Sequence, residues 1–395
     1  MRQIAGGALA HEDAAGAPAH ETPSGSAGVV LDVHHVSVEY GTAQGAVRAV
    51  DDVSFTLARG EVLGVAGESG SGKSTLANAI ARLLRPPARV VAGEVLYFPR
   101  AELGTHSPQT DPKPLDVLRL TPDELRAFRW RRLSIVFQSA MNALNPVLDI
   151  GTQISDVLQA HCPTMSRKTR QERAAELLRM VGIAPDRLRS FPHELSGGMR
   201  QRATIAIALA LNPELIIMDE PTTALDVVVQ REILAEIAGL RDRLGFSVIF
   251  ITHDLSLLLE IADRVAIMYA GRIVETGTAA RLHSQPRHPY TYGLLHSFPK
   301  VRGPRIALSG IPGSPPDLRA LPPGCAFHPR CSFAFDPCRS AIPALESCAG
   351  SGAGSVACHL YDDPAAFPIV DLSKPPVVAH ADSEDASPNG ASPCV

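Results

Sequence analysis

The chain has 395 residues, of which 45% are hydrophobic and 20% are charged, an ordinary composition for a soluble protein with one large or two smaller cores. A formal net charge of −4 gives no sign of the basic domain that nucleic-acid binding normally requires, so we expect no nucleic-acid partner. No stretch reaches the roughly 18 uninterrupted apolar residues of a membrane-spanning helix, so another chain would have to cross any membrane at which this protein acts.

The chain opens with an Ala/Gly/Ser/Pro-rich stretch, residues 1–28, which predicts a disordered leader without a secretion signal. Short β-rich runs then alternate with helical patterns, which indicates an α/β fold with a mainly parallel sheet. A helix-dominated insert at about 139–200 predicts a helical subdomain, with "TRQERAAELLRMVGI" as its clearest amphipathic helix. The runs predicted as strands are "EVLGVAGE", "RLSIVFQ", "PELIIMDEP" and "FSVIFITHD", and "KSTLANAIARLL" is predicted as a helix.

The character of the sequence changes after the α/β part. Residues 286–366 are predicted to be a Pro-rich linker followed by a small loop-rich unit that contains most of the cysteines, and residues 367–395 a disordered tail.

The segment "GESGSGKS", Gly67 to Ser74, fits the P-loop pattern and stands between a predicted strand and a predicted helix. Glycines let backbone N–H groups surround phosphates, while Lys73 would reach the β and γ oxygens and the Ser74 hydroxyl would bind Mg²⁺. ATP and Mg²⁺ are therefore the expected cofactors. The predicted nucleotide contacts here are Gly67, Ser69, Gly70, Ser71, Gly72, Lys73, Ser74 and Thr75.

Four polar residues follow predicted strands. Asp219 could hold Mg²⁺, and Glu220 could orient or deprotonate the attacking water. Gln138 suits a neutral ligand for Mg²⁺ and water, although alone it would more often be an exposed amide. His253 could hydrogen-bond a γ-phosphate, although a single His is more often structural.

A second anion-binding nest is predicted at "HELSGGMRQR". Ser196, Gly197 and Gly198 precede a run that reads as a helix from Met199 to about Leu211, so backbone N–H groups of a helix N-terminus would face an anion. No Lys or acid there could perform chemistry, which leaves open why the chain has this nest in addition to a complete P-loop.

The order of these motifs, namely P-loop, Gln138 turn, "LSGGMRQR", "IMDEP" with "TALD" and then "THD", resembles the nucleotide-binding domain of ABC ATPases over about residues 29–281. The resemblance implies an ABC-type P-loop domain at 29–285 with an antiparallel β part. It also implies that the signature binds the γ-phosphate of ATP held by a facing domain. By the same resemblance Tyr40 stacks on adenine and Asp226 lies at the nucleotide site.

A narrower resemblance, to ATP-binding subunits of dipeptide/oligopeptide ABC importers, is carried by "VRAVDDVSFTLARGE", "FQSAMNALNPVLDIGTQI", "HPYTYGLL" and "GCAFHPRCSFAFDPC". It implies an ATP-hydrolysing subunit on the cytoplasmic face of the inner membrane. The implied partners are two membrane-spanning permease subunits, a second ATPase subunit and an extracytoplasmic solute-binding protein. The alternative is a soluble ABC ATPase of translation or DNA repair, which a single P-loop and the absence of a heptad pattern disfavour.

The same resemblance brings a Cys-rich C-terminal extension. Four thiolates from a segment poor in apolar residues suggest a fold organised by a metal. The C-x₅-C-x₆-C spacing is wider than is usual for structural zinc, so a [4Fe-4S] cluster is favoured, with Zn²⁺, free thiols or disulfides as alternatives. Cys348 is an extra cysteine, and His359 a possible substitute ligand. The predicted ligands are Cys325, Cys331, Cys338 and Cys358.

Overall fold

The structure is a computed structural model that describes residues 28–100, 113–138, 143–222, 225–297, 310–347, 354–362 and 372. The predicted leader lies outside these residues apart from Gly28, and the predicted tail apart from Leu372. Within the described ranges, no helix is both long enough and apolar enough to span a membrane.

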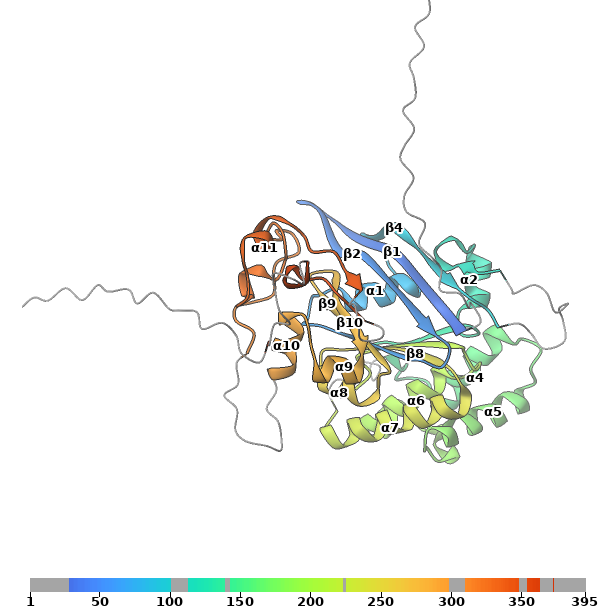
Figure 1. Cartoon of the computed structure of the whole chain (residues 1–395). Coiled ribbons are helices and arrows are strands. Elements are labelled where there is room, and N and C mark those ends of the chain that lie inside the picture. Colours follow the sequence, from blue (N-terminus) through green and yellow to red (C-terminus); the bar gives the residue numbers. More distant parts are fainter. Residues whose placement is uncertain are drawn as a thin grey trace, which may run out of the picture.

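The described strands form two sheets, drawn in Figure 1. One is antiparallel, with the order β2 (Gly45–Ala58), β1 (Val29–Thr42), β4 (Ala88–Tyr97) and β5 (Leu115–Asp116). The other has the order β11 (Glu346–Ser347), β12 (Gly354–Val356), β10 (Arg272–Thr278), β9 (Arg264–Tyr269), β3 (Val62–Ala66), β8 (Ser247–Thr252), β7 (Leu215–Asp219) and β6 (Leu133–Val136).

The centre of the larger sheet is parallel, because β9, β3, β8, β7 and β6 pair in the same direction. These strands are short apolar runs, and β3, β7 and β8 are buried along their whole length, as a parallel sheet covered on both faces requires. In β7, Ile216 and Met218 join one hydrophobic cluster, whereas Leu215 and Ile217 join the other. The sheet therefore separates two cores, and the predicted mainly parallel α/β fold is confirmed.

The helices are distributed over both sides of this sheet. α1, directly after β3, contributes Leu76 and Ile80 to the core beneath the antiparallel sheet. The helices are α1 (Lys73–Ile80), α2 (Pro122–Phe128), α4 (Ile150–His161), α5 (Arg167–Met180), α6 (Gly197–Ala208), α7 (Val227–Leu244), α8 (Leu255–Ile261), α9 (Ala279–Ser284), α10 (Pro289–His296) and α11 (Asp336–Ser340), with short 3₁₀ turns η2 (Val117–Arg119), η3 (Pro185–Arg189), η4 (Pro192–Glu194), η5 (His328–Arg330) and η6 (His359–Tyr361).

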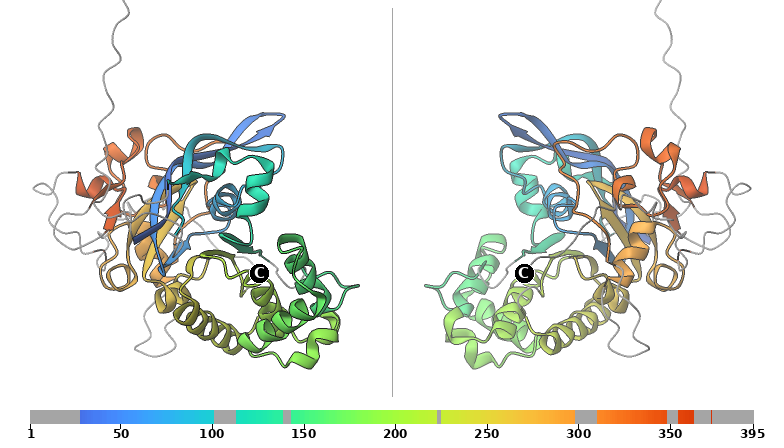
Figure 2. Two further views of the ribbon diagram at one scale, coloured as in Figure 1. Left: turned by 90° about the vertical axis from the view of Figure 1, so that its right-hand side faces the viewer. Right: turned by 90° about the vertical axis from the view of Figure 1, so that its left-hand side faces the viewer.

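A layer of helices lies on the side of the molecule away from the antiparallel sheet, drawn in green to yellow in Figure 2. Its helices α4, α5 and α6 pack on one another, and α6 also packs on α7. Side chains cap their N-termini: Asp149 accepts from Thr152 N, and Ser166 accepts from Thr169 N. The helix predicted at 169–183 is observed as α5.

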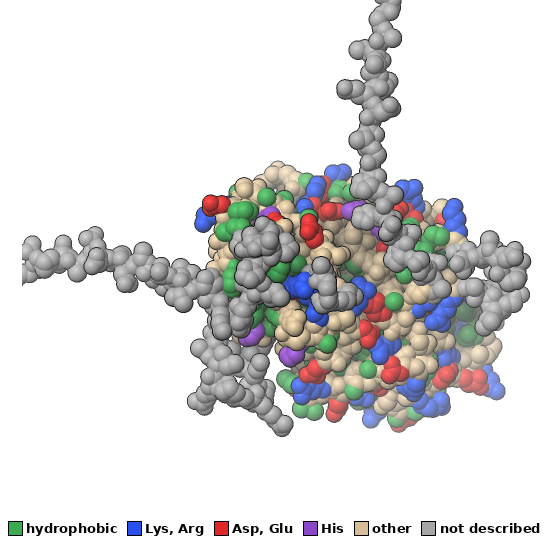
Figure 3. Space-filling model, viewed as in Figure 1, with side chains coloured by type: hydrophobic (Ala, Val, Ile, Leu, Met, Phe, Trp, Pro, Cys, Tyr) green, Lys and Arg blue, Asp and Glu red, His purple; other side chains and the backbone are tan. Residues whose placement is uncertain are grey.

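The C-terminal extension is joined to the main sheet. β12 pairs antiparallel with β10, and β11 continues the sheet beyond β12. On the face of the molecule in Figure 3, acidic and basic side chains are interspersed, without a large area of one sign.

Candidate functional site

The P-loop follows β3 and precedes α1, as the sequence predicts. Three of its glycines have positive φ, and two of these, Gly67 at 153° and Gly72 at 100°, also lie close to neighbouring backbone. A Cβ atom at Gly67 would lie 2.2 Å from the Met268 carbonyl oxygen, and one at Gly72 would lie 2.2 Å from the Ala49 carbonyl oxygen. Only glycine fits these positions, because the loop is pressed against neighbouring backbone.

Lys73 is the first residue of α1, and only 5% of it is exposed. Its Nζ donates to the carbonyl oxygens of Gly67 at 2.7 Å and Glu68 at 2.9 Å. Burial lowers the pKa of Lys73, against the attraction of Glu220 and Asp219. The ammonium is thus held by the loop itself.

Ser74 and Asp219 meet beside this lysine. The Ser74 Oγ donates to the Oδ1 of Asp219 at 3.0 Å, and Asp219 is 5% exposed at the end of β7. Burial raises the pKa of Asp219, and the hydrogen bond from Ser74 opposes that rise. A hydroxyl and a carboxylate oxygen are donors that Mg²⁺ prefers, so these two residues fit the predicted metal.

Glu220 lies next to two of the other predicted site residues. Its Oε2 accepts from the Nε2 of Gln138 at 2.9 Å, and its Oε1 lies 3.2 Å from the Nδ1 of His253. Glu220 has a positive φ of 46°, and its N–H donates to the Ile251 carbonyl at 2.8 Å. The three residues follow β6, β7 and β8, whose carboxyl ends meet at one edge of the parallel sheet.

The remaining predicted contacts lie around the P-loop or at helix ends. The Tyr40 hydroxyl is 3.2 Å from the Thr75 Oγ1, which places Tyr40 beside the start of α1. Gly70 has a φ of 81°, and the Ser71 Oγ lies 3.4 Å from the Lys73 Nζ. Like Ser69, Gly70 and Ser71 belong to the loop between β3 and α1.

The predicted signature is at the N-terminus of α6. Ser196 caps this helix by accepting from Met199 N at 3.3 Å, and Gly197 and Gly198 form its first turn. A Cβ at Gly198 would lie 2.9 Å from Val229 Cγ1 of α7. Asp226 caps α7, accepting from two N–H groups of the first turn at 3.1 and 3.0 Å.

Comparison with known proteins decides the family. Residues 50–223 match the family described as ABC transporter, and residues 274–338 match the oligopeptide/dipeptide transporter C-terminal region. The oligopeptide transport ATP-binding protein OppD of Bacillus subtilis is 44% identical over 78% of this chain and 82% of its own length. The dipeptide transport ATP-binding protein DppD of Caldanaerobacter subterraneus is 37% identical over 85% of this chain and 98% of its own length. This chain belongs to the ABC transporter family.

Solved structures of ABC cassettes share the fold. A dimeric ATP-binding cassette bound to ADP and Pi matches with a TM-score of 0.53 and 28% identity, over 63% of this chain and 98% of its own. The cbiO1 protein of Clostridium perfringens, part of an ABC transporter complex, matches with a TM-score of 0.53 and 27% identity. The match covers 65% of this chain and 92% of the cbiO1 chain. The predicted ABC ATPase, the ATP-binding subunit of a peptide-type ABC transporter, is confirmed, and the alternative of translation or DNA repair is not favoured.

The prediction of an iron–sulfur cluster in this ABC protein is wrong. Among the residues that the structure describes, no group of three or more His, Cys, Asp or Glu side chains could hold a metal ion, so neither a cluster nor zinc finds a ligand set. The four cysteines line a cavity of only about 10 Å³ and form no disulfide. They are Cys325, Cys331, Cys338 and Cys358.

The thiols of this group are largely buried, and burial changes their pKa values. It raises the pKa of Cys331 to about 12, and it also raises the pKa values of Cys325 and Cys358. Both ring nitrogens of His359 are engaged, with Asp362 and with the Ala341 carbonyl. Cys348 lies outside the described residues.

Sequence reasoning missed two residues that contact the P-loop from the C-terminal side. Tyr290 and Arg330 both meet Glu68, the second residue of the loop. The segments "HPYTYGLL" and "GCAFHPRC" carried a family resemblance, but nothing in their composition indicated a contact with the nucleotide site.

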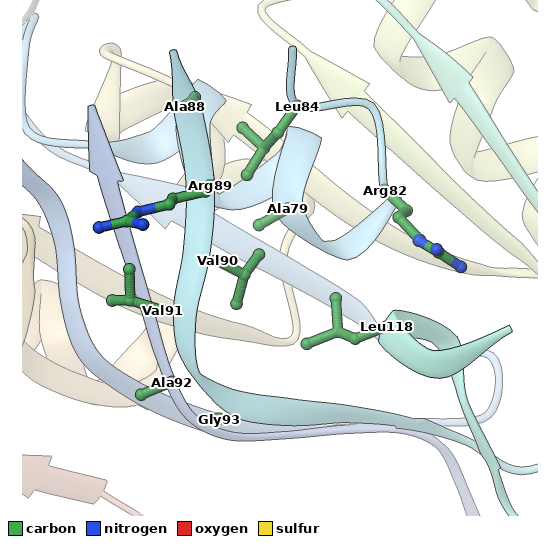
Figure 4. A pocket seen from close by; sticks show the side chains of 10 residues that line it. All are labelled: Ala79, Arg82, Leu84, Ala88, Arg89, Val90, Val91, Ala92, Gly93 and Leu118. Atoms are coloured by element: carbon green, nitrogen blue, oxygen red, sulfur yellow. The ribbon is translucent and has the colours of Figure 1, made fainter. Parts of the chain in front are cut away.

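A separate pocket of about 400 Å³ lies between α1 and β4 (Figure 4) and contains none of the predicted site residues. Val90 and Leu118 form its apolar centre, whereas Arg82 and Arg89 extend away from it. Arg82 donates to the Leu120 carbonyl. This pocket is apart from the nucleotide chemistry.

Proposed function

We propose that this ABC ATPase couples ATP hydrolysis to the import of di- or oligopeptides or similar solutes, at the cytoplasmic face of the inner membrane. The observation that carries the proposal is the combination, in one chain, of a complete set of P-loop residues with the oligopeptide/dipeptide transporter C-terminal region. The relatives named above are oligopeptide and dipeptide transport proteins, which supports this class of cargo.

Binding of ATP is assigned to the loop and the start of α1. Backbone N–H groups between Gly67 and Ser74 would surround the phosphates, and the Lys73 ammonium, now bonded to loop carbonyls, would turn to phosphate oxygens. Ser74 and Asp219 would hold Mg²⁺, which is supported by their 3.0 Å contact. Tyr40, next to Thr75, would stack on the adenine.

Hydrolysis is assigned to Glu220 as general base. The Mg²⁺-bound triphosphate supplies an electrophilic γ-phosphorus when it is present. The Glu220 carboxylate would then orient and deprotonate the attacking water, while Gln138 and His253 each hold one of its two oxygens. Their hydrogen bonds to Glu220 support roles as sensors that respond to the γ-phosphate.

The N-terminus of α6 is assigned to the nucleotide of a facing subunit. Ser196, Gly197 and Gly198 present the N–H groups and positive dipole end of a 12-residue helix, which favours an anion by about 0.3 to 2 kcal/mol. A second ATPase subunit, a copy or a related chain, would bring its own P-loop to this nest, with Asp226 nearby on α7. ATP would then join the two subunits, and hydrolysis would release them.

The motion of this ATPase pair would be passed to two membrane-spanning permease subunits through the helical layer and the Gln138 turn. A solute-binding protein outside the membrane would deliver the cargo. Because those chains select the solute, the cargo within the peptide class is set outside this chain.

Uptake of a radiolabelled oligopeptide by the host tests the proposed cargo. Deletion of the gene should abolish uptake, the wild-type chain should restore it, and Lys73→Ala should not. Mass spectrometry of proteins that co-purify with the chain from solubilised membranes should recover polytopic membrane proteins with a solute-binding protein. Unchanged peptide uptake after deletion, or ribosomes and DNA-repair factors as the recovered partners, would refute the importer assignment.

A further inference from the structure

A bidentate ion pair links the C-terminal extension to the P-loop. The Arg330 guanidinium donates from Nη1 to Glu68 Oε2 at 2.6 Å and from Nη2 to Glu68 Oε1 at 2.9 Å. The Arg330 side chain is 6% exposed and that of Glu68 is 25% exposed. Paired parallel hydrogen bonds between guanidinium and carboxylate fix both distance and orientation, so this contact sets the position of Glu68.

The backbone of Glu68 is held at the same time. Its N–H donates to the hydroxyl of the buried Tyr290 at 2.8 Å, and its carbonyl accepts from the Lys73 Nζ at 2.9 Å. The Ser71 N–H also donates to the Glu68 carbonyl, at 3.2 Å. Glu68 is therefore the point at which the C-terminal part of the chain contacts the phosphate-binding loop.

Arg330 is fixed on its own side. Its Nε donates to the Pro312 carbonyl at 2.8 Å, and its Nη1 lies 3.3 Å from the Tyr269 hydroxyl. The guanidinium carbon is 5.8 Å from the centre of the Tyr269 ring and 5.9 Å from that of Phe327. These contacts hold the side chain in one orientation toward the loop.

We propose that Arg330 is a positioning residue of the ATP site, which neutralises Glu68 and fixes the P-loop so that the C-terminal extension is required for tight nucleotide binding. The proposal rests on the P-loop binding ATP. Without Arg330, the Glu68 carboxylate would be an uncompensated negative charge close to Lys73 and to the phosphates. It would compete with them for the lysine and repel them.

A double-mutant cycle that removes each charge tests the proposal on the full-length protein. The variants are Arg330→Gln, Glu68→Gln and the double variant, and the measurement is the dissociation constant of MgATP and MgADP by calorimetry. Arg330→Gln should weaken MgATP binding by on the order of tenfold. The double variant, which lacks both charges, should bind within about threefold of the wild type, because the repulsive carboxylate has gone.

The matched control is Arg319→Gln. Arg319 belongs to the same extension and makes an equally short ion pair, 2.6 Å from Asp317, but it is 62% exposed and pairs within its own turn. Its loss should leave both dissociation constants unchanged. Thermal unfolding of every variant without nucleotide distinguishes a local change from loss of the extension.

Two outcomes would overturn the proposal. One is unchanged MgATP affinity in Arg330→Gln. The other is a loss of MgATP affinity in Arg330→Gln that the added Glu68→Gln change does not restore and that parallels a fall in unfolding temperature. That result would mean that Arg330 supports the fold in general and not the ATP site. Absence of ATP binding by the wild-type chain would instead refute the proposed function.

Discussion

The Oγ of Ser74 donates a hydrogen bond to the Oδ1 of Asp219 at 3.0 Å, although 145 positions separate the two residues in the sequence. Ser74 stands in the first turn of α1, and Asp219 ends β7, so the contact joins the phosphate-binding helix to the edge of the sheet. Burial of the carboxylate raises its pKa despite this bond and the nearby Lys73. Burial thus disfavours the charged form of Asp219 in the folded protein.

Asp219→Asn should raise the unfolding temperature of the nucleotide-free protein at pH 7 while abolishing Mg²⁺-dependent hydrolysis. A folded pKa above the unfolded one means that stability is lost as the pH rises through the folded value, and asparagine avoids this loss. The advantage of the variant should shrink as the pH falls toward about 4, the ordinary pKa of an aspartate. Calorimetric scans at several pH values measure the unfolding temperatures of the variant and the wild type. Equal unfolding temperatures at pH 7 would contradict a cost of burying the Asp219 charge.

Glu220→Gln should bind MgATP as tightly as the wild type and hydrolyse it about 10² to 10⁴ times more slowly. The amide keeps the shape of the group between Gln138 and His253 but cannot accept a proton. Phosphate release and nucleotide binding are measured on the same preparation. Glu172→Gln, at a surface carboxylate paired with Lys168, is the control. Rapid hydrolysis by Glu220→Gln would remove Glu220 from the role of base.

The sequence predicted the parts of the site that depend on short, local sequence motifs. A glycine-rich loop between strand and helix, and acids after an apolar strand, have the same consequence wherever they occur, so Lys73, Ser74 and Asp219 could be placed before the fold was known. Their meeting at one sheet edge also follows from the parallel strands. The Glu68–Arg330 contact could not be foreseen, because the two residues are 262 positions apart in the sequence and no pattern links them.

For the cysteines, the sequence instead suggested a metal site that the described residues do not form. Their number and spacing indicated four ligands, but spacing does not specify whether thiols that lie close together form a metal-binding group. In the fold, burial raises the pKa values of Cys325, Cys331 and Cys358, and the described residues contain no group that could hold a metal ion. The extension instead gains its support from the sheet, through the pairing of β12 with β10, and from the contacts of Arg330.

Lys73→Ala should weaken ATP binding by about 100-fold or more, because the variant lacks the buried ammonium that would contact the phosphates. The readout is the rise in unfolding temperature on adding MgATP. A ligand at 100 times its dissociation constant stabilises the wild type by about 2.7 kcal/mol, and the variant should lose nearly all of this shift. Lys168→Ala, at a lysine whose side chain is 87% exposed on α5, should keep it. A full shift in Lys73→Ala would exclude the lysine from phosphate binding.

Two glycine-to-alanine changes should have opposite effects on stability. Gly72→Ala places a Cβ 2.2 Å from the Ala49 carbonyl oxygen at a φ of 100°, so it should cost at least about 2 kcal/mol and disrupt nucleotide binding. Gly239 lies inside α7, and an added Cβ there would meet no neighbouring atom within 4 Å, so Gly239→Ala should stabilise the protein by about 0.5 to 1 kcal/mol. Urea unfolding with ATP-binding assays measures both. Normal ATP binding in Gly72→Ala would show that the loop can move away from Ala49 without losing its phosphate-binding geometry. The expected loss of ATP binding would establish that this close backbone approach shapes the site.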